Sequence, residues 1–112
     1  MELELAVKRL SALAQEGRLT VFRLLVKAGP DGVAAGEIAQ SLELPPNTLS
    51  AQLAILVNAG MASSRRAGRS IIYTARYDGM NELLAYLVDD CCQGKPEICM
   101  PAAQAVKPQA CC

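Results

Sequence analysis

Two clusters of glycine and proline most constrain how this chain folds, because both residues interrupt regular helices. One cluster is Ala28-Gly29-Pro30-Asp31-Gly32, and the other is Leu44-Pro45-Pro46. The segments on either side carry apolar residues at the i, i+3, i+4, i+7 spacing of amphipathic helices. The helices expected from this pattern cover residues 3–14, about 16–28, 33–42 and about 47–59, with Gly60 placed to cap the last of them. Two helices joined by a tight turn, as the last two are, follow the helix-turn-helix plan.

The hydrophobic period changes after Gly60. Met61–Arg66 and Ser70–Ala75 are short stretches, the second of them rich in β-branched and aromatic residues. Ala67-Gly68-Arg69 between them suits a hairpin turn. A final helix is expected from about Asp78 to Cys91, and after it prolines and scattered alanines without a period predict a tail with little regular structure. The expected fold class is therefore mainly α with a small β-hairpin, a winged helix-turn-helix.

The composition excludes several classes of function. The chain has no histidine, so catalytic Ser-His-Asp or Cys-His arrangements and imidazole-ligated metal sites are impossible. A length of 112 residues allows one domain with a modest core and no roomy substrate cavity. The sequence contains no glycine-rich phosphate loop and no convincing pair of carboxylates. We therefore expect neither an enzyme nor a bound organic cofactor.

The start of the chain and the use of cysteine indicate a compartment. Met1-Glu2-Leu3-Glu4-Leu5 is acidic and lacks the basic-then-apolar order of a signal peptide, and the longest apolar runs are too short to span a bilayer. We therefore expect a soluble cytoplasmic protein that has no membrane partner. Because thiols stay reduced in that compartment, the five cysteines are interpreted as ligands or sensors rather than as a disulfide framework.

A formal net charge of zero conceals a gradient along the chain. Residues 1–76 carry nine basic and six acidic side chains, whereas residues 77–112 carry two basic and five acidic ones. The first part is better suited to an anionic partner. Residues near the start of the second helix of the helix-turn-helix would face base edges, and arginines of the hairpin would meet phosphate or the minor groove. These candidates for DNA binding are Asn47, Thr48, Ser50, Ala51, Gln52, Arg65, Arg66 and Arg69.

A simpler interpretation is that Asn47 and Thr48 cap a helix and that the arginines form a solvated face. The combined order of helix, turn, helix and basic hairpin favours DNA binding. Three segments then resemble the ArsR/SmtB family of winged-helix repressors. They are Leu13–Leu19, Leu49–Leu53 with Leu56 and Ala59–Met61, and Ser64–Tyr73.

This resemblance covers roughly residues 5–92. It implies a homodimer, built largely from the first and last helices, that binds a palindromic operator and releases it when an inducer arrives. The expected organisation is a DNA-binding and dimerisation domain at 1–92 and a cysteine-containing tail at 93–112. Two features depart from the family pattern: Gln52 stands where the family usually has histidine two positions after the recognition-helix serine, and Pro45-Pro46-Asn47 replaces the polar start of that helix.

The cysteines indicate the inducer. Members of this family place sites on the third helix, with a Cys-x-Cys type box, or on the last helix, with histidine and carboxylates. Residues 33–38 contain no cysteine and the chain has no histidine, which leaves Cys91, Cys92 and Cys99. Three thiolates without a nitrogen partner suit a trivalent centre such as As(III) or Sb(III), and the arrangement resembles arsenic-responsive members with a vicinal pair and a downstream cysteine. We therefore expect a metalloid-responsive repressor, of the kind that serves arsenical resistance.

Three other interpretations stay open at this point. A repressor selective for organoarsenicals would need only two thiolates, and a thiol-redox-sensing DNA-binding regulator would respond to peroxide. A metalloid carrier would use the cysteine-rich tail and never bind DNA. Cys111-Cys112 would supply an alternative third ligand, collect metalloid for delivery, or have no dedicated role.

Overall fold

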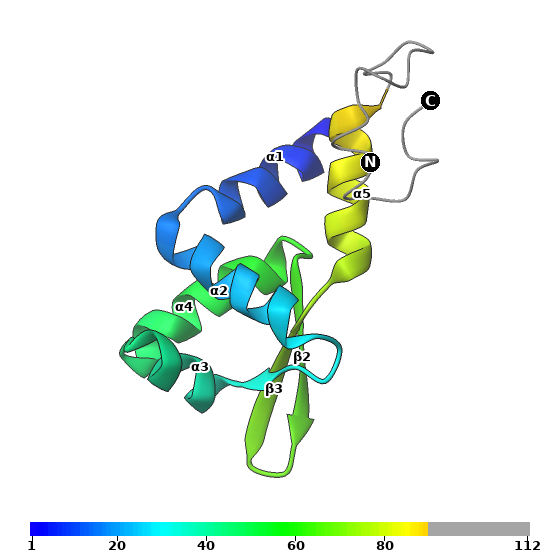
Figure 1. Ribbon diagram of the computed structural model, residues 1–112. Coiled ribbons are helices and arrows are strands. Elements are labelled where there is room, and N and C mark those ends of the chain that lie inside the picture. The colour runs from blue at the N-terminus through cyan, green and yellow to red at the C-terminus, as the bar shows by residue number, and fades with distance from the viewer. Residues whose placement is uncertain (90–112) are drawn as a thin grey trace.

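The computed structural model describes residues 1–89 (Figure 1). These residues contain five helices and one antiparallel sheet of three strands in the order β1-β3-β2, a winged helix-turn-helix, as predicted. In chain order the elements are α1 Leu3–Leu13, α2 Glu16–Ala28, β1 Val33–Ala34, α3 Ala35–Leu42, α4 Pro46–Asn58, β2 Ala62–Ala67, β3 Ser70–Ala75 and α5 Tyr77–Val88.

The core lies where α2, α3 and α4 meet the sheet. Leu49, Leu53 and Leu56 occupy one side of α4 and are buried, as the spacing predicted. They pack with α2, which contributes Val21, Phe22 and Leu25, and with Ile38 of α3, Met61, and Leu83 of α5. Burial of a side chain of this size contributes about 1.5–3 kcal/mol, so the leucines of α4 fix its rotation about its own axis.

Gly60 ends α4, which confirms its predicted role as a cap. Its φ of 80° lies in the left-handed region that glycine tolerates best. The N–H of Gly60 donates to the carbonyl of Val57 at 3.0 Å, and the N–H of Met61 donates to the carbonyl of Leu56 at 2.9 Å. These are the two bonds of a Schellman motif. The motif buries Met61 and directs the chain into β2.

The predicted hairpin is confirmed and forms the wing. Strands β2 and β3 pair from Ala62 opposite Ala75 to Ala67 opposite Ser70, which leaves Gly68 and Arg69 as the turn. Gly68 has a φ of 63°, as expected for glycine at the first central position of a two-residue turn. In Figure 1 the wing extends away from the helices.

The predicted helix 33–42 is wrong at its start. Val33 and Ala34 form β1, which pairs with Tyr73 and Ile72 of β3, and α3 begins only at Ala35. The pairing requires a close approach at Gly32, where an added Cβ would lie 2.6 Å from the carbonyl oxygen of Tyr73. Since the open edge of β3 satisfies the backbone of these two residues, the chain is extended there before it turns into α3.

The last helix is shorter than predicted. Helix α5 ends at Val88 rather than near Cys91, because Asp89 leaves helical geometry with a ψ of 128°. A carboxylate at the negative end of the helix dipole is also unfavourable. The expected ligands Cys91, Cys92 and Cys99, the second pair Cys111-Cys112 and the expected domain boundary after residue 92 lie outside the described residues. Within residues 1–89, the helices are too short or too polar to cross a lipid bilayer.

Candidate nucleic-acid interface

The outer face of the first turns of α4 presents short side chains, three of which are polar. Asn47, Thr48, Ser50 and Ala51 are all exposed, opposite the buried leucines of the same helix. The helix begins with Pro46 at its first position, where proline is well tolerated. The Oδ1 of Asn47 accepts the backbone N–H of Thr48 at 3.1 Å, but neither residue caps the helix as the simpler interpretation held, because Pro45 is the N-cap and no side chain bonds there. This face can enter a groove without displacing any part of the core.

Gln52 lies at the edge of that face and is turned away from it. Its side chain is half-buried, and its Oε1 is buried without a hydrogen-bond partner. Its Nε2 lies beside Gly17 near the start of α2, where an added Cβ would come within 2.6 Å. The structure thus places four of the five predicted α4 residues on the outer surface and turns the fifth toward α2.

The three predicted arginines of the wing are in two different situations. The Nη2 of Arg65 donates to the backbone carbonyl of Asp31 at 2.8 Å, which ties the wing to the loop before β1. Arg66 points to the opposite face of β2, since successive side chains of a strand alternate, and Arg69 lies in the turn. Both are exposed, and neither takes part in the ion pairs formed within residues 1–89. The wing therefore offers two available cations and one that is already bonded.

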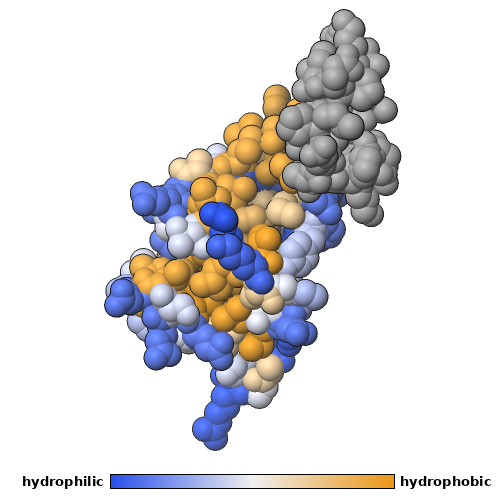
Figure 2. All heavy atoms as spheres, in the orientation of Figure 1, coloured by the Kyte–Doolittle hydropathy of each residue, from blue (hydrophilic) through white to orange (hydrophobic). Residues whose placement is uncertain are grey.

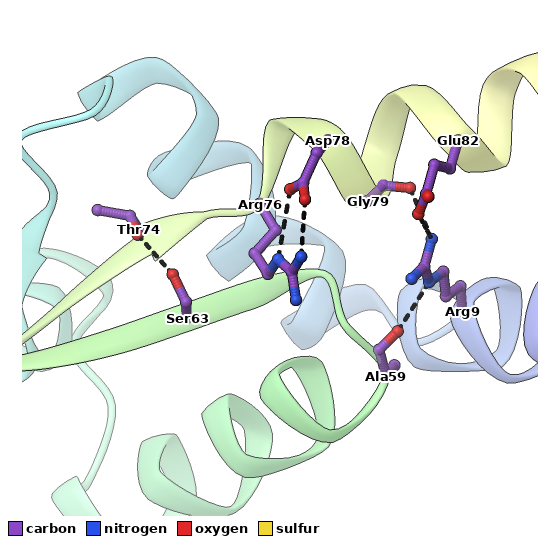
Figure 3. A network of polar contacts seen from close by, with 8 residues as sticks. All are labelled: Arg9, Ala59, Ser63, Thr74, Arg76, Asp78, Gly79 and Glu82. Carbon is purple, nitrogen blue, oxygen red and sulfur yellow. Dashed lines mark hydrogen bonds and ion pairs between the residues drawn. The ribbon is translucent and has the colours of Figure 1, made fainter.

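A buried arginine that the sequence reasoning passed over lies between α1, α4 and α5 (Figure 3). The side chain of Arg9 is only 8% exposed. Its Nε donates to the carbonyl of Ala59 at 2.9 Å, and its Nη1 donates to the carbonyl of Gly79 and to Oε1 of Glu82, both at 3.0 Å. A charged group out of water must be paired in this way to be tolerated. We call this set of contacts the Arg9 junction.

The Arg9 junction brings two helix ends into direct contact. A Cβ on Gly79, in the first turn of α5, would overlap the carbonyl oxygen of Gly60, which follows the end of α4. The sequence carries one usable sign of this site: Arg9 lies on the same line of α1 as the small buried residues Ala6 and Ala12. Small neighbours at i−3 and i+3 leave room for a long side chain to lie along the helix.

The start of α5 is held by further polar contacts. The hydroxyl of Tyr77 donates to the carbonyl of Val26 in α2 at 3.0 Å. Arg76 pairs with Asp78 through Nη2 and Oδ2 at 2.7 Å and through Nε and Oδ1 at 3.3 Å (Figure 3). The hydrogen bond from Arg76, followed by one from the backbone N–H of Gly79, lowers the pKa of the Asp78 carboxyl. The carboxylate is thereby favoured in the first turn of α5, where the helix dipole also favours it.

Helix α1 keeps much of its apolar side at the surface. Leu3 is 66% exposed, Val7 53% and Leu10 40%, and Leu87 of α5 is 49% exposed. Figure 2 shows hydrophobic residues at the surface along α1, beside α5. These residues belong to the first and last helices, from which the resemblance implied that a homodimer is built. Several large apolar side chains gathered on neighbouring elements are typical of a protein interface.

Known proteins share this architecture. A family described as a helix-turn-helix domain matches residues 13–65, from the end of α1 into the wing. The HTH-type transcriptional regulator YgaV of Escherichia coli (strain K12) is 28% identical over 89 residues, which cover 80% of this chain and 88% of that protein. A relative that regulates transcription agrees with the expectation that this chain is not an enzyme.

Two solved structures add to this. The homodimeric winged helix-turn-helix DNA-binding domain of Mb0332 from Mycobacterium bovis, a possible ArsR-family transcriptional regulator, matches with a TM-score of 0.65 and 29% identity, over 79% of this chain and 81% of that one. HlyU from Vibrio cholerae N16961 matches with a TM-score of 0.59 and 32% identity, over 78% of this chain and 97% of that one.

Proposed function

The chain belongs to the ArsR-like winged helix-turn-helix transcriptional regulators, and from that premise we propose that it is a homodimeric repressor that binds operator DNA with α4 and the wing. The observation that carries the proposal is the exposed outer face of α4 together with the two exposed arginines of the wing. The first turns of α4 would face base edges in the major groove. Arg66 and Arg69 would contact phosphates and so set the position of the protein on the duplex.

The exposed apolar residues of α1 and α5 support the homodimer. A second copy would cover Leu3, Val7 and Leu10 together with Leu87, and burial of such side chains is favourable. The corresponding domain of Mb0332 is homodimeric. A two-fold dimer places its two recognition helices on half-sites about one helical turn, roughly 34 Å, apart, so the operator would be a palindrome.

We propose further that trivalent arsenic or antimony, bound by Cys91, Cys92 and Cys99, releases the DNA. All five cysteines follow Asp89, and the chain has no histidine. Within residues 1–89, no cluster of three or more cysteine, histidine or acidic side chains is placed to hold a metal ion. Three thiolates are a suitable donor set for a soft trivalent centre. Binding would join the three cysteines, all of which follow α5, to one arsenic or antimony atom.

The Arg9 junction supports a connection between that segment and the recognition helix. Cys91 follows the last residue of α5, Val88, by three positions, and the first turn of α5 contacts the end of α4 through Arg9 and Gly79. A shift of α5 would therefore change where α4 ends relative to α1. Coupling between two sites is typically about 1–3 kcal/mol, which corresponds to a loss of DNA affinity of about 5- to 150-fold.

Titration of the DNA complex with arsenite tests the proposal, with duplexes first selected by the protein from a random library. The wild type should release its DNA, whereas the double variant Cys91→Ser/Cys92→Ser should hold it. Cys111→Ser/Cys112→Ser is the matched control, because it removes the same number of thiols from the end of the chain. If the Cys91→Ser/Cys92→Ser variant releases DNA at the same arsenite concentration as the wild type, the ligand assignment is wrong.

The same titration separates the competing interpretations. Loss of the arsenite response in Cys99→Ser with a retained methylarsenite response would identify an organoarsenical sensor, which needs two thiolates. Release by peroxide that a dithiol reverses would identify a redox switch. A carrier would bind arsenite and show no salt-dependent affinity for any duplex.

A further inference from the structure

Gln52 is the one polar side chain of α4 that is not exposed, and the whole of α4 lies within the described residues. It belongs to the helix turn that follows Thr48 and Ser50, both of which face outward. Its amide instead lies against the corner between α1 and α2, in front of Gly17. The corner also faces the next turn of α4, since Ser11, Ala12 and Arg18 line a cavity together with Ile55 and Asn58.

Glycine at position 17 makes the space that the amide occupies. A Cβ there would lie 2.6 Å from Nε2 of Gln52, closer than two such atoms can approach without moving, and 3.3 Å from its Cδ, which is a tight contact. Gly17 does not have a positive φ, so its backbone conformation does not call for glycine. A glycine inside a helix is less stable than alanine, and here it leaves a slot for the side chain of Gln52.

The slot holds the amide of Gln52 but provides no hydrogen-bond donor for its oxygen. The Oε1 of Gln52 is buried and accepts no hydrogen bond. A buried carbonyl oxygen without a donor is unfavourable, so the side chain gains when it moves to a partner that pairs both ends of the amide. The major-groove edge of adenine offers such a partner, because its N6 amino group donates and its N7 accepts.

We propose that Gln52 is an adenine-reading residue that is stored against Gly17 in the free protein and swings into the major groove on DNA. The inference rests on the proposed DNA binding by α4. The slot competes with DNA for the same amide, so the apparent affinity is reduced by the fraction of molecules in which Gln52 is stored. Gly17 therefore tunes specificity although it does not touch DNA itself.

Gly17→Ala is the variant that tests the slot, since its methyl group would expel the end of a flexible side chain. Gly36→Ala is the matched control, because Gly36 is also a helical glycine and an added Cβ there meets nothing within 4 Å. Gln15→Ala is the second control. The Oε1 of Gln15 caps α2 by accepting the N–H of Arg18 at 2.9 Å, and it would lie 3.1 Å from the new methyl group.

The storage of Gln52 is measured without DNA, by NMR of the side-chain amide in the full-length reduced protein. The resonances are assigned by their loss in Gln52→Ala. They should move to the position of a solvated amide in Gly17→Ala and stay in place in Gly36→Ala and Gln15→Ala. Resonances that do not move in Gly17→Ala, or that move equally in Gln15→Ala, would overturn the slot.

The reading of adenine is measured by selection of duplexes from a random library, followed by affinities for the selected site and for the site with that adenine replaced. A bidentate contact discriminates by about 1–3 kcal/mol, or about 5- to 150-fold. Wild type should show this preference at one position of each half-site, Gln52→Ala should lose it, and Gly17→Ala should strengthen binding only when Gln52 is present.

The two proposals fail in different ways. If wild type enriches no sequence at all, DNA binding fails and the reading of adenine fails with it. If wild type and Gln52→Ala enrich the same site with the same base preferences, the protein binds DNA as proposed but Gln52 does not read it. Equal effects of Gly17→Ala with and without Gln52 would show that Gly17 acts on α2 rather than through the amide.

Discussion

The wing and the Arg9 junction use the same residue type for opposite purposes. On the wing, Arg66 and Arg69 are exposed and free of the ion pairs formed within residues 1–89. At the junction, Arg9 is buried and bonded to two backbone carbonyls and a carboxylate. An exposed guanidinium can exchange water for phosphate, whereas a buried one must be paired within the protein. The surroundings of an arginine therefore decide whether it serves binding or architecture.

The largest effect is expected at the Arg9 junction. Arg9→Met should lower the free energy of unfolding by about 3–6 kcal/mol, because it removes two buried hydrogen bonds from a charged donor, to the carbonyls of Ala59 and Gly79, at about 1.5–3 kcal/mol each. Glu82→Gln should cost about 0–1 kcal/mol, since Glu82 is 62% exposed and its ion pair is largely screened. Urea unfolding at one fixed protein concentration measures both values.

Measured together, the two variants test whether the buried arginine of the junction really differs from the exposed arginines of the wing. Equal losses in Arg9→Met and Glu82→Gln would mean that the ion pair, and not the two carbonyl bonds, holds α1 against α4 and α5. The junction would then depend on salt in the same way as the wing.

An intermediate effect is expected on the wing, on DNA affinity rather than on stability. Arg66→Ala and Arg69→Ala should each reduce the slope of log affinity against log salt concentration by about 0.9, the value for one phosphate contact. The free energy of unfolding of both variants should stay within about 0.5 kcal/mol of the wild-type value. Arg65→Ala should differ, since it also removes the bond to the carbonyl of Asp31 and frees the wing from the loop before β1.

Measurements of DNA affinity and of unfolding on the three variants therefore separate the two arginines available for DNA, Arg66 and Arg69, from Arg65, which is bonded within the protein. If Arg66→Ala leaves the salt dependence unchanged and lowers stability, Arg66 is a structural residue like Arg9, and the assignment of the wing cations to DNA is wrong.

The parts of the fold that were predicted from the sequence are those that local forces determine. Glycine and proline end α2 and separate α3 from α4, and the spacing of apolar residues marks α1, α2 and α4 within a residue or two. The hairpin is also determined locally, because Gly68 allows its turn and the β-branched and aromatic residues of Ser70–Ala75 favour its second strand. Strand β1 was missed because its two residues are extended only through pairing with β3, about forty positions later.

The candidate site divides in the same way. Exposure of Asn47, Thr48 and Ser50 follows from the leucine spacing of α4. The direction of Gln52 does not, because it depends on Gly17 in another helix. Burial of Arg9 depends on a glycine seventy positions away that lets two helix ends touch. Small residues thus mark both sites, and their meaning appears only when their distant neighbours are known.

The smallest effect is expected at Arg76, an arginine that is paired like Arg9 and exposed like Arg66. Its side chain donates a hydrogen bond to Asp78, and this bond, followed by one from the N–H of Gly79, lowers the pKa of the Asp78 carboxyl. A carboxyl whose pKa is lower in the folded state adds stability above its unfolded pKa and loses it as the pH falls through the folded value. Asp78→Asn should therefore lower the Tm slightly at pH 7, and the difference should vanish in acid once the wild-type carboxyl is protonated.

Asp89→Asn is the matched control for this last variant, since it removes the same charge from the other end of α5, where a carboxylate opposes the helix dipole. Its Tm at pH 7 should stay the same or rise. The loss in Asp78→Asn should also shrink at 1 M salt, where exposed charges are screened beyond about 3 Å. A loss at pH 7 as large as that of Arg9→Met would reverse the comparison, because α5 would then be held by an exposed pair rather than by the buried arginine.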